Sequence, residues 1–172
     1  MDRGLVEQEF TEFVAARSHA LLPAAYALTG DQHAAEDLVQ GALAKAYLHW
    51  PEIRGDAEPY VRRIMYHDSV SRWRRPHRRA ETTMAAPPDR ASQSDDVDLR
   101  LVLREALLAL PPRQRAVLVL RYLEDLSVDE TAEVLGCRRG TVASQANRAL
   151  AKLRATVGDL QHASIHGERL AG

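Results

Sequence analysis

The chain of 172 residues contains one cysteine, Cys137, and few aromatic residues. A single cysteine excludes an internal disulfide and predicts a reducing compartment. No stretch approaches the ~20 consecutive apolar residues that span a membrane, and the first residues lack the charged and then apolar plan of a signal peptide. These absences predict a cytoplasmic protein.

An excess of charge of either sign is also lacking, because the formal net charge is −1. Contact with nucleic acid must therefore come from local clusters, and one lies between Pro59 and Arg79, where seven arginines face only one acid, Asp68. Lysine occurs only at Lys45 and Lys152. Arginine offers a planar fork for phosphates and guanine edges. A GC-rich genome is an alternative cause of the arginine content.

No pattern in the sequence predicts an active site. Phosphate-cradling glycine loops, nucleophile elbows and metal-ligand cysteine pairs are all missing. His162 and His166 have the i, i+4 spacing that can bind a metal, but no third ligand lies near them in the sequence. We therefore predict no enzymatic activity, no cofactor and no metal site.

Residues 127–156 carry the most specific local pattern. Ser127 and Glu130 form a capping box, and Gly136 supplies a turn at positive φ. In the segment that follows, apolar residues recur at helical spacing, at Val142, Ala146, Ala149, Leu150 and Leu153. Every charged residue of this segment is basic, namely Arg138, Arg139, Arg148, Lys152 and Arg154. The pattern predicts a helix-turn-helix for the DNA major groove. A small hairpin with a solvated basic face is the alternative.

Strand signals are nearly absent, so we predict an all-α fold of two small helical domains joined by a flexible linker. Pro23 predicts a kink or a break near Ser18–Leu22 in the first helical run. Residues 76–97 show no periodic pattern, which predicts disorder in the free protein. The predicted helices cover about 5–28, 32–50, 59–75, 98–110 and 113–122, followed by the helix-turn-helix. The predicted parts are domains at 5–77 and 98–157, a linker at 78–97 and a frayed tail at 158–172.

The basic segment between Pro59 and Arg79 also contains aromatic rings, at Tyr60, Tyr66 and Trp73. Stacking of an unpaired base on such a ring contributes ~1–3 kcal/mol and needs no fixed sequence. The segment thus predicts a surface for single-stranded nucleic acid beside a duplex-binding module. In the alternative, Trp73 belongs to the core and the arginines are solvated.

Three stretches resemble the group IV (extracytoplasmic-function, ECF) sigma factors of bacterial RNA polymerase, and most of all the actinobacterial SigE-like subfamily. The resemblance covers about residues 5–157 in the expected order. Residues 28–40, LTGDQHAAEDLVQ, resemble the core-binding stretch, and residues 59–75, PYVRRIMYHDSVSRWRR, resemble the −10 element segment. Residues 110–122, LPPRQRAVLVLRY, together with the helix-turn-helix, resemble the −35 domain.

The resemblance implies a subunit that directs core polymerase to promoters, recognises −35 and −10 elements and melts DNA. Contact with the β′ clamp helices is implied for Asp37, Leu38, Val39 and Gln40. Contact with −10 DNA is implied for Trp50, Arg54, Tyr60, Arg62, Arg63, Tyr66, Arg72, Trp73, Arg74 and Arg75. The second domain is implied to lie on the β flap, with a −35 reading face of Arg138, Arg139, Thr141, Ser144, Gln145 and Arg148. The resemblance also allows an anti-sigma factor as a partner.

Several residues depart from the family pattern. Gly41 stands where the family usually has Glu, and Ala143 and Gln145 stand where basic residues are common. Fewer phosphate contacts follow, although Gln145 is able to bond an adenine edge. In the linker, Asp89, Asp95 and Asp96 can imitate the charge of RNA near its exit path. Two rival classes stay open: a helix-turn-helix repressor or activator that binds duplex DNA alone, and an interaction protein that binds polymerase without DNA.

Overall fold

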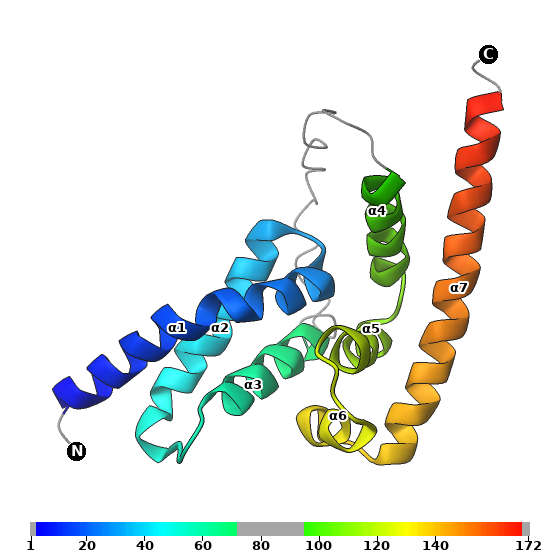
Figure 1. The fold of residues 1–172 in the computed structure, drawn as a ribbon. Helices are drawn as coiled ribbons and strands as arrows, with labels where there is room; N and C mark the ends of the chain where they lie inside the picture. The colour runs from blue at the N-terminus through cyan, green and yellow to red at the C-terminus, as the bar shows by residue number, and fades with distance from the viewer. Residues whose placement is uncertain (1–2, 72–94, 170–172) are drawn as a thin grey trace.

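The computed structural model of the chain describes residues 3–71 and 95–169, and for residues 95–98 and 160–169 it describes the backbone alone. Within these ranges every regular element is helical, which confirms the all-α prediction for this part of the chain. Figure 1 shows a first domain of α1 to α3 beside a second domain of α4 to α7. The elements are α1 (Arg3–Thr29), α2 (Gln32–Leu48), the 3-10 turn η1 (Trp50–Glu52), α3 (Glu58–Ser71), α4 (Asp95–Leu108), α5 (Pro112–Leu118), the π-helical turn η3 (Val119–Leu123), α6 (Val128–Leu135) and α7 (Arg139–Arg169).

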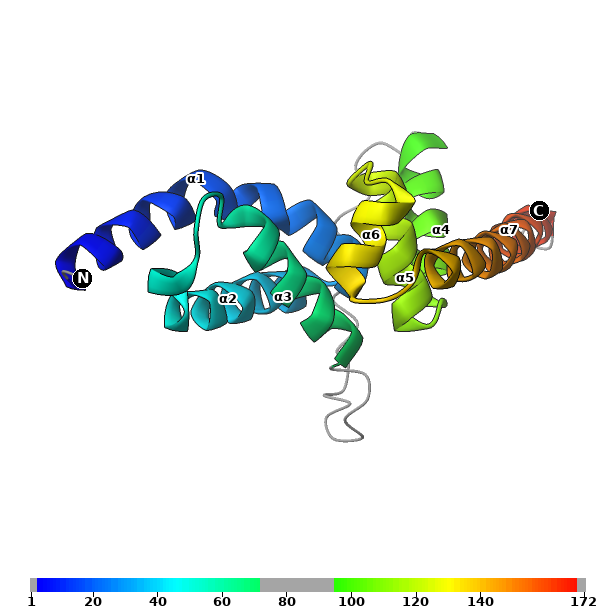
Figure 2. The ribbon, with the colours of Figure 1, turned by 90° about the horizontal axis from the view of Figure 1, so that it is seen from below.

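The first helix is continuous. Of the two alternatives predicted for the region near Ser18–Leu22, a kink or a break, the break was therefore wrong. α1 runs through Pro23, and Figure 2 shows the helix arching along its length. Pro23 removes a single backbone donor, the one that would bond to the carbonyl of His19. Leu21 and Leu28 are buried, so the packing of α1 on α2 outweighs this local cost.

The turn between α1 and α2 has the stop and the cap that the sequence predicts. Gly30 adopts a φ of +74°, and its N–H donates to the carbonyl of Tyr26 at 2.7 Å. The carboxylate of Asp31 accepts a hydrogen bond from the N–H of Ala34 at 2.8 Å and caps α2. A side chain at Gly30 would collide with Leu108 of α4. The turn is therefore what requires glycine, because its φ is positive, whereas the end of the half-buried Leu108 side chain can shift.

The helix-turn-helix prediction is confirmed by α6 and α7. The hydroxyl of Ser127 accepts from the N–H of Glu130 at 3.2 Å, and the Glu130 carboxylate accepts from the N–H of Ser127 at 2.7 Å. These two bonds form the predicted capping box. The bonds from Ser127, first of all that from its backbone N–H, lower the pKa of the Glu130 carboxyl. Gly136 then ends α6 at a φ of +62°.

The start of the second domain lies earlier than predicted. α4 begins at Asp95 rather than at Asp98, so Asp95 and Asp96 belong to its first turn and not to a linker. The rest of the predicted linker, with its expected disorder and Asp89, lies outside the described residues.

Two further helix ends differ from the prediction. α5 ends at Leu118 and passes into η3, where the sequence predicted one helix as far as Tyr122. α7 continues to Arg169, where a frayed tail was expected from Gly158 onward. A glycine inside a helix costs only about 1 kcal/mol relative to alanine, and no proline follows it to end the helix.

One hydrophobic core runs through both domains. Its buried members come from α1, α2, α3, α5, η3, α6 and α7 and include Leu21, Leu38, Val61, Met65, Val117, Leu120, Leu135 and Val142. A smaller cluster of Leu110, Leu118 and Ala149 holds α7 to α5. α3 packs on α5 and α6, and α1 packs on α4, α5 and η3. We call these contacts between the two domains the interdomain joint.

Candidate nucleic-acid interface

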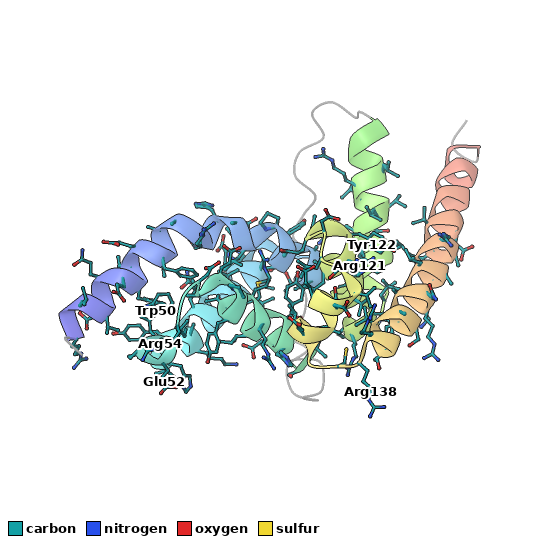
Figure 3. All side chains as sticks on the ribbon, turned by 60° about the horizontal axis from the view of Figure 1, so that its bottom comes forward. Trp50, Glu52, Arg54, Arg121, Tyr122 and Arg138 are labelled. Carbon is teal, nitrogen blue, oxygen red and sulfur yellow. The ribbon has the colours of Figure 1, made fainter. Side chains whose placement is uncertain are left out.

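The outer side of α7 and Arg138, which directly precedes this helix, carry the residues that the sequence predicts to read the −35 element. Val142 and Ala149 are fully buried on the inner side. All six predicted residues are exposed or half-buried, namely Arg138, Arg139, Thr141, Ser144, Gln145 and Arg148. Figure 3 shows the side chain of Arg138 pointing away from the body of the molecule. This side of α7, which we call the reading face, is therefore open to a DNA groove.

Two local contacts shape the reading face. The Nε atom of Arg139 lies 2.6 Å from a carboxylate oxygen of Asp129, and both side chains are largely exposed. Such a surface ion pair contributes about 0–1 kcal/mol, so a DNA phosphate can replace Asp129 at little cost. The hydroxyl of Ser144 donates to the carbonyl of Thr141 at 3.1 Å.

A pocket of about 510 Å³ opens beside the loop that joins η1 to α3. Arg54, Tyr60 and Arg63, three of the predicted −10 residues, line it. The Nη1 atom of Arg54 donates to the carbonyl of Pro51 at 3.2 Å, which ties the side chain to the loop. A pocket lined by an aromatic ring and two cations suits an unstacked base and its phosphates. Three acidic residues, Glu52, Asp56 and Glu133, line the pocket as well. We call this feature the loop pocket.

Trp50 packs within an aromatic cluster beside the loop pocket. Its ring centroid lies 5.0 Å from that of Phe10, edge-on, and 5.1 Å from that of Phe13. Phe10 in turn lies 4.9 Å from Tyr47. The Phe10–Trp50 pair is edge-to-face and the other two pairs are tilted, and contacts of both kinds favour a defined ring orientation. Figure 3 shows Trp50 close to Arg54, so the cluster anchors the loop to α1.

Arg62 and Tyr66, both predicted to contact −10 DNA, lie in the interdomain joint. The Nη2 atom of Arg62 is 2.9 Å from a carboxylate oxygen of Glu58 and 2.9 Å from one of Glu124. Tyr66 is fully buried. Burial raises the pKa of the Tyr66 hydroxyl, and the negative charge of Glu124 raises it further. In this conformation neither side chain is free to contact DNA.

The predicted polymerase contact divides into two kinds of residue. Asp37 and Gln40 are exposed on α2, whereas Leu38 and Val39 are buried, with 1% and 2% of their surface exposed. The polar pair is thus the accessible part of this stretch, and the apolar pair holds α2 in the core. The remaining predicted −10 residues, Arg72, Trp73, Arg74 and Arg75, lie outside the described residues.

Sequence reasoning missed Arg115, which ties the two domains together. Its guanidinium donates to the carbonyl of Leu28 in α1 at 2.6 Å and to those of Leu107 and Leu108 in α4 at 2.9 and 2.8 Å. A cation is favourable at the C-terminal ends of these helices, where carbonyls have no helical partner. Burial lowers the pKa of Arg115. No local pattern distinguishes this arginine from Arg113 and Arg121, its neighbours in the sequence.

Two negative findings apply to the described ranges, 3–71 and 95–169. They contain no group of three side chains able to hold a metal ion. No helix in them is long and apolar enough to cross a membrane. His162 and His166 lie on the part of α7 for which only the backbone is described.

Family models match both domains. The model of Sigma-70 region 2 matches residues 13–79, and that of Sigma-70 region 4 matches residues 100–153. The two matches define the class of protein as a sigma-70-type transcription factor, and they fall on the loop pocket and on the reading face respectively.

Curated relatives narrow this class. The RNA polymerase sigma-E factor of Streptomyces coelicolor is 40% identical over 152 residues, which cover 85% of this chain and 84% of the relative. The ECF RNA polymerase sigma factor SigL of Mycobacterium tuberculosis is 35% identical over 154 residues, with coverage of 83% and 86%. The chain belongs to the ECF family of RNA polymerase sigma factors. It directs core polymerase to specific promoters, which decides against the two rival classes.

Two solved structures share the fold. The sigma factor RpoE of Bartonella quintana, in complex with the anti-sigma factor NepR, has a TM-score of 0.66 and 24% identity, covering 88% of this chain and 98% of that one. CnrH in complex with the cytosolic domain of CnrY has a TM-score of 0.63 and 22% identity, with coverage of 89% and 90%. At this level of identity the likeness concerns the fold alone.

Proposed function

We propose that three surfaces of this chain divide the work of promoter recognition and melting. The exposed polar side of α2, with Asp37 and Gln40, contacts the β′ clamp helices. The loop pocket, with Arg54, Tyr60 and Arg63, takes an unstacked base of the melted −10 element. The reading face of α7 binds the −35 duplex while the second domain lies on the β flap.

The division of α7 into two sides is the observation that carries this proposal. The inner residues Val142 and Ala149 have no exposed surface, and the outer side bears arginines together with Gln145. A helix with one side fixed in the core and a basic opposite side enters the major groove as a rigid unit. Each base contact then contributes specificity, and each phosphate contact contributes affinity at every site.

The chain acts by binding, and we propose no catalytic step of its own. Its place of action is the cytoplasm, where polymerase works. One protein of the same fold, the sigma factor RpoE, is in complex with the anti-sigma factor NepR in its solved structure. We propose an anti-sigma partner for this chain as well.

Run-off transcription with core polymerase on genomic fragments tests the assignment. Arg148→Ala removes a charge from the reading face, and Arg154→Ala removes an exposed charge of the same helix outside it. We expect Arg148→Ala to cost ~1–3 kcal/mol of promoter binding if the side chain reads a base, and to lower the salt slope by about one if it binds a phosphate. Equal losses in both variants would refute the reading face.

A further inference from the structure

An ion pair joins α2 to α3 on the surface of the first domain. The Nζ atom of Lys45 in α2 donates to both carboxylate oxygens of Asp68 in α3, at 2.5 and 2.7 Å. The side chain of Lys45 is 56% exposed and that of Asp68 is 22% exposed. Figure 1 shows the two helices side by side, and the pair connects them at the last turn of α3.

Asp68 stands at an unfavourable place for a carboxylate. It is the only acid between Pro59 and Arg79, where the sequence has seven arginines. It also lies in the last turn of α3, where the helix dipole favours a cation over an anion. An uncompensated charge at Asp68 would therefore destabilise its own helix end and repel the phosphates of a nearby DNA strand.

The exposed side of α3 leads from the loop pocket to Asp68. Tyr60 and Arg63 line the loop pocket, and the exposed His67 continues the same side of the helix, four residues after Arg63. Asp68 follows His67 directly. A strand that leaves the loop pocket along this side of α3 thus passes Asp68 before it reaches the end of the helix.

The packing of α2 on α3 has sources other than the ion pair. Leu43 of α2 is buried in one hydrophobic cluster with Val61 and Met65 of α3, and the two helices pack together. An exposed ion pair adds little to stability, because water screens the charges and two side chains lose freedom. What the pair changes is the charge of the surface, since the side chains of Lys45 and Asp68 are neutral together.

Lys45 is well placed to supply the compensating charge. It lies in the last turn of α2, where the helix dipole favours a cation. Its ammonium is a compact charge on a flexible stem, which reaches across to both oxygens of Asp68. The lysine belongs to the helix that carries the proposed polymerase contact, so the pair also links that helix to the one proposed to contact the −10 strand.

We propose that Lys45 is a positioning residue for the melted −10 strand, which acts through Asp68 by holding this carboxylate against α2 and cancelling its charge. Without Lys45, the carboxylate of Asp68 repels the strand; with Lys45 in place, the strand is not repelled at this point of α3. This inference rests on the proposed binding of −10 DNA by the first domain. It assigns Lys45 no contact of its own with DNA or with polymerase.

A cycle of charge removals in the full chain tests the proposal. Lys45→Met removes the ammonium and keeps most of the stem, Asp68→Asn removes the charge and keeps the shape, and the double variant removes both charges. Arg3→Met is the matched control, because it removes the cation of another surface ion pair, that of Arg3 with Glu7 at 3.5 Å. Each variant is assembled with core polymerase. Fluorescence anisotropy then measures its binding to a labelled non-template strand that carries the −10 sequence of a promoter found by run-off transcription.

We expect Lys45→Met to weaken strand binding about fivefold, which is the effect of one like charge near a phosphate in largely aqueous surroundings. Asp68→Asn should bind at least as tightly as wild type, and the double variant and Arg3→Met should stay within about twofold of wild type. A double variant as weak as Lys45→Met would mean that the lysine contacts DNA itself, and the proposal would be wrong. A loss in Asp68→Asn equal to that in Lys45→Met would mean that binding needs the intact pair, which also overturns the proposal.

Two further measurements exclude other causes of a loss in Lys45→Met. Urea unfolding should show the same stability for the double variant as for wild type, because apolar packing holds α2 to α3. Pull-down of core polymerase should be equal for all variants. A loss of pull-down in Lys45→Met would make the lysine a polymerase contact and would overturn its role through Asp68.

A comparison with Arg63→Ala separates this result from the proposed function of the first domain. If Arg63→Ala weakens strand binding and Lys45→Met does not, the proposed function stands and only the role of Lys45 is wrong. If both variants bind the strand like wild type, the first domain does not bind −10 DNA as proposed, and the role of Lys45 falls with that function.

Discussion

Single residues fix both ends of α6, the shorter of the two helices of the helix-turn-helix. Ser127 and Glu130 bond reciprocally at its start and satisfy backbone N–H groups that a helix start leaves without partners. Gly136 closes the other end in the left-handed region, where a residue with a side chain costs roughly 1–2 kcal/mol. Because α6 has only 8 residues, its position depends on these caps as much as on its buried side chains.

The cap at Glu130 predicts a pH dependence. Its pKa is lowered in the folded chain by the bonds from Ser127, so the charged carboxylate favours the folded state. This contribution is complete above the ordinary glutamate pKa of ~4.3 and is lost as the pH falls through the lower folded value. Glu130→Gln keeps an acceptor oxygen for the N–H of Ser127 but does not titrate.

Thermal melting of wild type and Glu130→Gln over a pH series measures this effect. We expect the difference between the two melting temperatures to be constant near about pH 7 and to shrink below about pH 5. Taking the difference removes the contribution of the other carboxylates, which titrate in both proteins. A difference that stays constant down to about pH 3 would contradict the role of the charge.

At the scale of elements, helix existence was predictable and helix ends were less so. The period of apolar residues located α2 and α7, and the Ser127 to Gly136 pattern located α6 with its caps. The same local reasoning gave a kink or a break near Ser18–Leu22 because of Pro23, and a frayed end from Gly158, whereas α1 and α7 both continue as helices. Both errors share a cause: a local cost of about 1–3 kcal/mol was weighed without the helix context around it.

Burial along α2 separates a structural from a binding role within one sequence motif. Leu38→Ala should destabilise the chain by about 2–5 kcal/mol, because its side chain is buried in the core. Asp37→Ala, at an exposed position, should change stability by no more than about 0.5 kcal/mol yet weaken binding to core polymerase. Urea unfolding and pull-down of core enzyme check the two halves of this prediction. Retained pull-down by Asp37→Ala would remove α2 from the polymerase contact.

At the scale of the whole molecule, the interdomain joint could not be predicted from the sequence. Arg62 stands in the stretch that resembles the −10 segment, whereas Glu124 lies in the short stretch between residues 110–122 and the helix-turn-helix, for which no role was expected. No periodicity relates the two residues. Their pairing at 2.9 Å depends on how two domains fit together, which local patterns do not encode. The buried state of Tyr66 has the same origin, since its ring belongs to a core completed by the second domain.

The segment between the domains sets how far they can separate. Ten residues span at most ~33 Å when extended, and two turns of DNA span ~68 Å. We expect deletion of ten residues between 76 and 94 to abolish promoter-dependent initiation and to leave circular dichroism unchanged. Replacement of the same ten residues by a Gly-Ser sequence is the control, because it keeps the length of the segment and changes only its composition. Normal initiation by the shortened chain would refute the spanning arrangement.

The continuity of the hydrophobic core has a consequence for how the free chain melts. Buried residues from α1 to α7 form one cluster, so neither domain can lose its structure without exposing apolar surface of the other. Calorimetry of the free protein should show a single transition, with equal calorimetric and van't Hoff enthalpies. A variant that weakens the joint, Arg104→Ala with Glu124→Lys, removes the bond from Arg104 to the carbonyl of Gly30 and places a second cation beside Arg62. This variant should instead show two overlapping transitions. One transition in both proteins would mean that the cooperativity does not pass through the joint. If only the variant shows two transitions, separation of the two domains at a promoter would turn one cooperative folding unit into two.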